Sequence, residues 1–438
     1  MQLRRVEPIT HVVQQHLDDA AVLSHIRSSL VSVSQIDLLG LRRWDDRIAA
    51  HLEGLAISGD RGWALCDVVL QSPGLGEVFV AAVRAIEDRR FELLDRLLSE
   101  FEVADVQRGL SAAFGWVSAR TLQGLVKHLL SSSCAARRSL GISACAAHRV
   151  DPGTALEAAT AIEEPGLRAV ALRAIGELGR QDLTPTCIRA LGDDVEACRF
   201  SAACSAVLLG NRGAALAVLG EIAGSEGSHS AEALLLYLRA SAPGAGHAFL
   251  ANRLRASGRT RMLIAGAGAV GDPKYVAWLL KLMEEPELAR LAAESFTLIT
   301  GVDLARGFDA PRPAPAVEKT EGDVEGGQAE TELADDDGSS AEANDETSDI
   351  SEDEYLAWPH VPKLIQWWRD HRHSFVESGR YFVGAPISVA HCTEVLLRGT
   401  QRQRIAAAQL LRVLQPGVAL FNTSAPAWRQ QRLLSEVS

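Results

Sequence analysis

The chain carries RAVALRAIGELG at 168–179, RFSAACSAVLLG at 199–210 and RLAAESFTLITG at 290–301, three blocks in which glycine follows eleven residues after arginine. RMLIAGAGAVG at 261–271 is the same block one residue shorter, and RSLGISACAAH at 138–148 begins a similar block without the glycine. A degenerate unit, AEALLLYLRAS, lies near residue 230. The blocks therefore recur with a step of about thirty residues, and internal similarity at this period is typical of a solenoid.

Each block predicts the first helix of a helical hairpin. Apolar side chains recur at three- and four-residue spacing, as at Val170, Leu172, Ile175 and Leu178. The terminal glycine can adopt the left-handed conformation that ends a helix, and a shorter helical stretch follows it. Because alternation of β-branched residues is nearly absent, we expect no sheet. The sequence therefore predicts an all-α fold, an α-solenoid of HEAT-like helical hairpins.

The N-terminal third has the same texture with a looser period. A long amphipathic helix is predicted at about 11–30, and a second begins at Ser34, with Asp37 forming a capping-box-like pair. Shorter helices are predicted at about 60–71, 77–88, 91–101, 104–116 and 119–131. The predicted organisation is an N-terminal helical cap at 1–59, the solenoid at 60–310, an acidic disordered linker at 311–354 and a small helical, Trp/Arg-rich domain at 355–438.

The net charge of -12 over 438 residues is unevenly distributed. Residues 316–354 hold sixteen Asp or Glu and one Lys, residues 355–438 sum to +6, and residues 1–315 sum to -3. The acidic stretch cannot bury enough apolar surface to offset its ordering entropy, so we expect disorder there. Two roles stay open for it: a solvated spacer, or a segment that folds back on the basic end piece and screens it.

Composition also bears on location. No run approaches the roughly 18 apolar residues of a membrane span, and MQLRRVEPIT leads into no signal-peptide core. The seven cysteines form no CxxC pair, which favours a reducing compartment over a disulfide framework. We therefore expect a soluble, cytoplasmic protein without membrane insertion.

Motifs for catalysis or cofactor binding are weak. GAGAVG at 266–271 fits the dinucleotide fingerprint, but Asp272-Pro273 ends the element where the fingerprint needs a helix to begin. His360, His371, His373 and His391-Cys392 have only loose metal-like spacing. No G-x-S-x-G, P-loop or H-E-x-x-H is present. We expect no catalytic, cofactor or metal site.

The end piece is the candidate interaction surface. It holds four of the eight tryptophans, together with RQR at 402–404 and WRQQR at 428–432. Such residues can stack on single-stranded nucleic acid, anchor a protein interface or form the core of a small helical domain. The candidate surface residues are Trp367, Trp368, Arg369, Arg402, Arg404, Trp428 and Arg429.

Several blocks resemble a known bacterial family. They are DDRIAAHLEGLAISGDRGW at 45–63, FTLITGVDL at 296–304, RYFVGAPIS at 380–388, QRQRIAAAQLL at 401–411 and LFNTSAPAWRQQRLL at 420–434. The family consists of uncharacterised HEAT-like repeat proteins that are often encoded beside type VI secretion genes. The resemblance implies a cytoplasmic accessory, adaptor or chaperone-like factor of a secretion apparatus or its cargo, and it carries over no catalytic residues.

Three function classes follow from these observations. The first is a non-enzymatic protein–protein interaction scaffold or adaptor, because stacked helical pairs form a curved superhelix with an extended concave surface. The second is a regulator or inhibitory partner of a secreted toxin. The third is a HEAT-like enzyme such as a bilin lyase or DNA glycosylase. A glycosylase needs a basic groove, and the sum of -3 over residues 1–315 disfavours it and a nucleic-acid partner.

Overall fold

The computed structural model describes residues 8–33, 35–71, 73–100, 103–255, 258–312, 353–376 and 378–436. These residues form 22 α-helices, which confirms the all-α prediction. The expectation of no sheet misses one short hairpin, in which β1 (Tyr381–Phe382) pairs antiparallel with β2 (Ala385–Pro386). Most of the predicted acidic linker lies outside the described residues.

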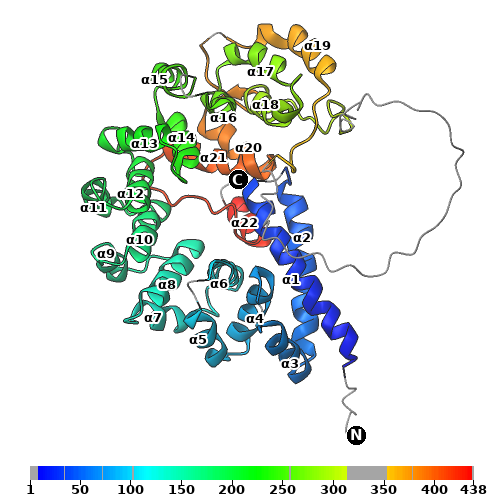
Figure 1. The fold of residues 1–438 in the computed structure, drawn as a ribbon, viewed down its shortest axis with the longest axis vertical. Helices are drawn as coiled ribbons and strands as arrows, with labels where there is room; N and C mark the ends of the chain where they lie inside the picture. The colour runs from blue at the N-terminus through cyan, green and yellow to red at the C-terminus, as the bar shows by residue number, and fades with distance from the viewer. Residues whose placement is uncertain are drawn as a thin grey trace, which may run out of the picture.

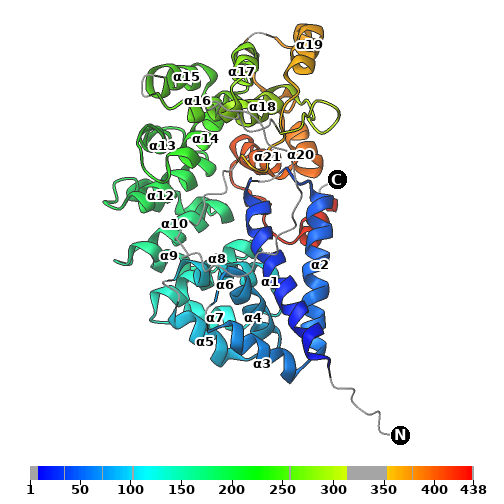
Figure 2. The same cartoon turned by 45° about the vertical axis from the view of Figure 1, so that its right-hand side comes forward.

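The first two helices form a long antiparallel pair. Helix α1 (Thr10–Val33) confirms the helix predicted at 11–30, and α2 (Leu38–Ile57) follows. Helix α2 begins four residues after the predicted start at Ser34 because Asp37 is its N-cap, with the carboxylate accepting from Gly40 N at 2.7 Å. Figures 1 and 2 show α1 on the inner side of the molecule, with its C-terminal end beside α21 (Gln401–Leu414).

Sixteen further helices follow as an arc in the described part of the chain. In Figure 1, α4 and the even-numbered helices after it line the inner side, and α5 and the odd-numbered helices after it lie outside them. Their bounds are α3 Asp60–Val69, α4 Leu75–Glu87, α5 Phe91–Ser99, α6 Ala104–Trp116, α7 Leu125–Leu130, α8 Ala135–His148, α9 Thr154–Ala159, α10 Pro165–Leu178, α11 Thr184–Ala190, α12 Glu196–Leu208, α13 Ala214–Gly224, α14 Ser230–Ala240, α15 Pro243–Phe249, α16 Thr260–Val270, α17 Val276–Leu282 and α18 Pro286–Thr300. Successive inner helices pack on one another, and the apolar core follows the arc between the two layers.

The glycines of the sequence blocks end the inner helices as predicted. Gly179, Gly271 and Gly301 have φ of +72°, +74° and +75° and are the C-caps of α10, α16 and α18. A residue without Cβ adopts this left-handed conformation at little cost. GAGAVG therefore lies at the end of helix α16 rather than in a cofactor-binding turn.

The arginines of two blocks also have equivalent contacts. Arg168 Nη1 donates to the carbonyls of Ile162 and Glu163 at 2.6 and 3.0 Å, six and five residues upstream. Arg199 Nη1 donates to the carbonyls six and five residues upstream of it, at 2.8 and 3.1 Å. Each arginine thus ties the start of an inner helix to the turn before it.

The C-terminal residues, predicted as a small helical domain at 355–438, pack along the array. Helix α19 (Val361–His371) lies against α17, α21 packs on α1, α12 and α14, and α22 (Ala427–Ser435) packs on α2. Helix α20 (Val389–Arg398) packs on α21. Leu364 of α19 is buried in the cluster around α17 and α18, whereas α20, α21 and α22 share a small apolar cluster with the end of α1 and the start of α2.

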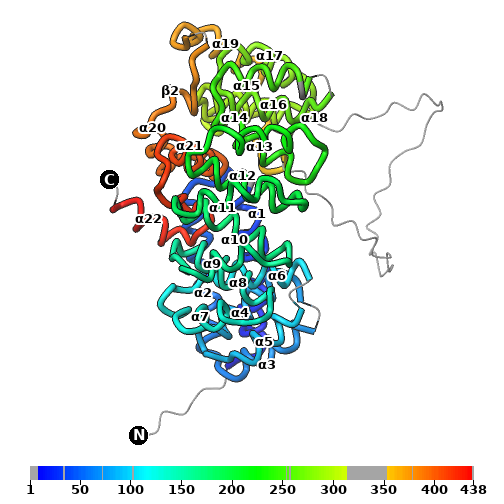
Figure 3. The backbone as a smooth tube through the Cα atoms, turned by 90° about the vertical axis from the view of Figure 1, so that its left-hand side faces the viewer, coloured from blue at the N-terminus to red at the C-terminus, as the bar shows by residue number. Residues whose placement is uncertain are grey.

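Residues 380–429, which we call the C-terminal strap, lie across the C-terminal ends of seven inner helices. Figure 3 shows the strap, orange to red, along one side of the array. The last carbonyls of a helix have no partner within it, and strap groups supply donors to them. The bonds run from Arg380 to Leu238 O (2.7 Å), from Tyr381 N to Gly271 O (2.8 Å), from Val383 N to Leu298 O (2.6 Å), from Arg412 to Leu208 O (3.1 Å), from Leu420 N to Glu177 O (2.8 Å), from Asn422 to Ala147 O (2.9 Å) and from Arg429 to Gly115 O (2.9 Å).

Candidate binding cavity

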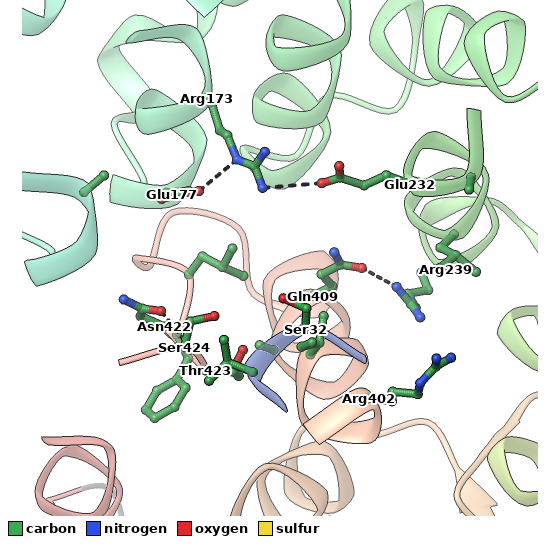
Figure 4. Close-up of a pocket in the computed structure, with 18 of the residues that line it drawn as sticks. Ser32, Arg173, Glu177, Glu232, Arg239, Arg402, Gln409, Asn422, Thr423 and Ser424 are labelled. Atoms are coloured by element: carbon green, nitrogen blue, oxygen red, sulfur yellow. Dashed lines mark hydrogen bonds and ion pairs between the residues drawn. The ribbon is translucent and has the colours of Figure 1, made fainter. Parts of the chain in front are cut away.

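The concave side of the arc is largely occupied by the chain itself. Helices α1, α2, α21 and α22 fill it, so the expected open concave surface is reduced to a cavity of about 900 Å³. Its walls come from α8, α10, α14, α16 and α18 on one side. The end of α1, helix α21 and residues 420–424 form the other side. The cavity thus joins segments that lie far apart in the sequence (Figure 4).

One wall of the cavity carries a row of paired charges. Arg173 Nε lies 3.1 Å from Glu177 Oε1, and Arg173 Nη2 lies 3.4 Å from Glu232 Oε1. Glu177 Oε2 also accepts from Arg149 Nη1 at 3.2 Å. Burial lowers the pKa of Arg173, but Glu177 and Glu232 raise it further, so the net shift of that pKa is upward. These two arginines and two glutamates balance one another.

The same side of the cavity also holds an arginine without a carboxylate partner. Arg239 of α14 is 7% exposed, and within the described residues no carboxylate oxygen lies within 4 Å of it. Its Nη1 donates to the amide oxygen of Gln409 of α21. Burial, with a contribution from the charge of Arg380, lowers the pKa of Arg239 to about 10, so the guanidinium is charged at neutral pH. A buried cation normally has an anionic partner, and this one has a neutral amide.

Glu294 of α18 is the buried acid of the cavity lining. It is 4% exposed, and its Oε2 accepts from Gln35 Nε2 at 2.5 Å. Burial raises the pKa of Glu294, although the charge of Arg402 and the bond from Gln35 oppose the rise. Its Oε1 accepts no hydrogen bond from the described residues.

The seven candidate surface residues do not gather at one place. Trp367 and Trp368 are half-buried on α19 among aromatic neighbours, with Trp367 6.0 Å from the ring of Phe296, and Arg369 is exposed on the same helix. Arg402 of α21 is the member that lines the cavity. Helix α19 therefore holds three of the candidates, and the cavity holds one.

The remaining three candidates are used inside the chain. Arg404 is 0% exposed, and it donates to Leu396 O at 2.8 Å and to the side chain of Gln430. Trp428 packs edge-on against Trp116 with ring centroids 4.8 Å apart. Arg429 donates to the carbonyls at the end of α6. The sequence alone could not distinguish these internal contacts from a surface role, because tryptophan and arginine occur in both.

Sequence reasoning missed Arg239, Glu294 and Gln409. A signal existed for Arg239, because it is the one arginine in the otherwise largely apolar run AEALLLYLRA. A charged residue on a buried helix face is rare unless it is paired. Glu294 lies on the alanine-rich block RLAAESFTLITG and gave a similar, weaker signal.

One other group places an acid, an imidazole and a hydroxyl in a row. Asp272 Oδ2 lies 3.0 Å from His247 Nε2, and His247 Nδ1 lies 2.9 Å from Tyr275 Oη. Burial and the Asp272 charge raise the pKa of Tyr275 to about 12, which disfavours the hydroxyl as a nucleophile. Asp272 also caps the following turn by accepting from Lys274 N at 2.9 Å. These contacts therefore indicate a structural role, in which the three side chains join α15 to the start of α17.

The described residues contain neither a metal-binding group nor a membrane-spanning helix. No three His, Cys, Asp or Glu side chains are grouped as a metal ion requires, and none of the helices has the length and apolar character that a membrane span requires. Comparisons of the chain with protein-family models, with curated proteins and with solved structures found no match.

Proposed function

We propose that the protein is a non-enzymatic scaffold that holds a segment of a protein partner in the central cavity. In this proposal the arc is an α-solenoid of HEAT-like hairpins, and the glycine stops and the equivalent contacts of Arg168 and Arg199 support it. The observation that carries the proposal is the cavity of about 900 Å³ with mixed polar and apolar walls. That volume lies within the range of specific ligand sites.

The strap supports a binding role because it holds the walls in place before a partner arrives. A wall whose helix ends are already bonded loses little freedom on binding, and preorganisation of this kind lowers the entropy cost of association. The paired charges of Arg173, Glu177 and Glu232 suit recognition of polar groups rather than acid–base chemistry, since each is matched by a neighbour.

The family resemblance extends the proposal to a biological setting. Members of that family are often encoded beside type VI secretion genes, so we propose a component of that apparatus or its cargo as the partner. The protein would then act as an adaptor or accessory factor.

A blocking variant tests the scaffold proposal. Ala231 is exposed at the start of α14 and lines the cavity, so Ala231→Trp fills the space without displacing core residues. Ala217 is exposed on the outer helix α13, and Ala217→Trp is the matched control. Each full chain would be used for affinity capture from the source organism, with the captured proteins identified by mass spectrometry. We expect the wild-type chain and Ala217→Trp to retain a shared partner that Ala231→Trp loses. Equal capture by all three chains, or no partner under several conditions, contradicts the proposal.

A further inference from the structure

Arg239 is a buried cation whose hydrogen-bonding capacity is mostly unused. A guanidinium has five N–H donors, and in the described part of the chain one of them has a protein acceptor, Gln409 Oε1. None of its nitrogens is among the buried atoms that lack a partner, which means that the unused donors face accessible space. The residue lines the cavity, so that space is the cavity itself.

The charges around Arg239 favour the binding of an anion beside it. Arg380 lies on the strap beside it and donates to the carbonyl of Arg239 at 2.9 Å, which brings a second positive charge close. Glu294 is the buried acid of the lining, but Arg402 and Gln35 already interact with it. The row of Arg173, Glu177 and Glu232 is balanced within itself. The excess positive charge of the cavity is therefore at Arg239.

The cavity lining also indicates the size and charge of the anion that would pair with Arg239. A phosphate carries nearly two negative charges and would meet Glu177, Glu232 and Glu294 in the same cavity, whereas a carboxylate carries one. Ser32, Gln409, Asn422 and Thr423 bring neutral polar side chains to the lining. The Asn422 amide already bonds to Ala147 O and Ser424 N, and Gln409 Oε1 to Arg239, so the two amides offer their remaining N–H groups to backbone carbonyls. Apolar side chains such as Leu235 and Leu298 complete the wall. This combination fits a short peptide better than a free ion.

We propose that the cavity binds an acidic side chain of a partner peptide, with its carboxylate held at Arg239. The inference rests on the proposed scaffold function and names the chemistry that the partner brings. A planar guanidinium pairs with a carboxylate through two parallel N–H···O bonds, and the burial of Arg239, which is 7% exposed, strengthens that pair. The rest of the peptide bonds to the neutral polar groups of α21 and residues 422–423.

The test measures thermal unfolding of the full chain with four probes at constant ionic strength. The probes are acetate, glutarate, inorganic phosphate and acetyl-alanyl-glutamyl-alanine amide, with chloride as the reference. We expect saturable stabilisation by the carboxylates, of about 2 °C at ten times Kd. The peptide should bind more tightly than acetate because its amides reach the polar wall. Stabilisation by phosphate alone overturns the carboxylate assignment, and equal affinities for acetate and the peptide overturn the peptide assignment.

Two variants, with Arg369→Gln as the control, locate the effect at Arg239. Arg239→Gln should weaken peptide binding at least about tenfold, while Arg369→Gln, an exposed arginine on α19, should leave it unchanged. Gln409→Glu places a carboxylate at the acceptor of Arg239, so it should raise the midpoint temperature without ligand and abolish the response to the peptide. If Arg239→Gln does not fold, the response of Gln409→Glu to the peptide tests the proposal. If the peptide stabilises Arg239→Gln and Gln409→Glu as much as the wild-type chain, the proposal is overturned.

The scaffold proposal and the ligand chemistry can fail separately. If Ala231→Trp loses a captured partner while no carboxylate probe binds, the cavity holds a protein segment and the role of Arg239 is wrong. If carboxylates bind through Arg239 and no protein is captured, the site is a carboxylate site and both the scaffold proposal and the peptide assignment are wrong.

Discussion

Gly271→Ala is the substitution that most directly probes the contact between the strap and the array. Gly271 ends α16 with φ of +74°, and a Cβ built there would lie 2.0 Å from the carbonyl oxygen of Tyr381. Alanine in this left-handed conformation costs about 1–2 kcal/mol. The clash must also displace β1 and weaken the 2.8 Å bond from Tyr381 N to Gly271 O, which adds about 1 kcal/mol. We expect a total loss of about 3 kcal/mol in the free energy of unfolding.

Gly307→Ala is the matched control for that prediction. Gly307 also has positive φ, +92°, but among the described residues no atom beyond its chain neighbours lies within 4 Å of a Cβ placed on it. This variant should lose about 1–2 kcal/mol, the conformational part alone. Urea unfolding followed by circular dichroism gives both values, and hydrogen exchange should show faster exchange of the Tyr381 amide only in Gly271→Ala. Equal losses with unchanged protection of Tyr381 would refute the reasoning that the strap presses on the helix end.

Three further outcomes follow from burial and charge. Arg404→Ala should lower the free energy of unfolding by about 4 kcal/mol, because it leaves buried acceptors at Leu396 and Gln430 without a donor. The control Arg398→Ala removes an exposed ion pair with Glu394, whose N···O distance is 3.5 Å, and should lower the free energy of unfolding by less than about 0.5 kcal/mol in the same urea titration. Burial raises the pKa of Glu294, so as pH rises from about 4 this carboxyl ionises in the unfolded chain before it ionises in the folded one, and its contribution to the free energy of unfolding falls. Glu294→Gln should remove this contribution, so the midpoint temperature of the variant relative to wild type should increase from pH 4 to pH 8. Cys134 is the exposed thiol, so iodoacetamide at pH 8 should modify it first in the folded protein, with mass spectrometry identifying the site; early modification of a buried cysteine would contradict the packing.

Helix positions were predictable where local signals agree. The helix predicted at 104–116 coincides with α6, and the block glycines end their helices. The helix predicted at 119–131 is shorter, because Gly124 has φ of +84° and α7 begins at Leu125. Local spacing and capping determine these features, so a single sequence is enough to find them.

The strap and most of the cavity could not be predicted in the same way. The bonds from Arg429 to the end of α6 join positions more than 300 residues apart, and no local pattern records such a pairing. Arg402 and Arg404 are two residues apart in one motif, yet one lines the cavity and the other is fully buried. Their roles depend on the helix face each occupies and on which distant segment covers it, which is tertiary information.

The order of the strap contacts has a consequence for how the protein is made. Synthesis produces the array first, so α6 to α18 leave the ribosome with their terminal carbonyls hydrated. Residues 380–384 then reach the most recently made helices, and residues 412–429 close progressively older ones, ending at α6. Pairings this distant in sequence form slowly. A nascent chain halted before residue 380 would therefore expose seven unfinished helix ends at once, the state in which premature association with other chains is most favoured.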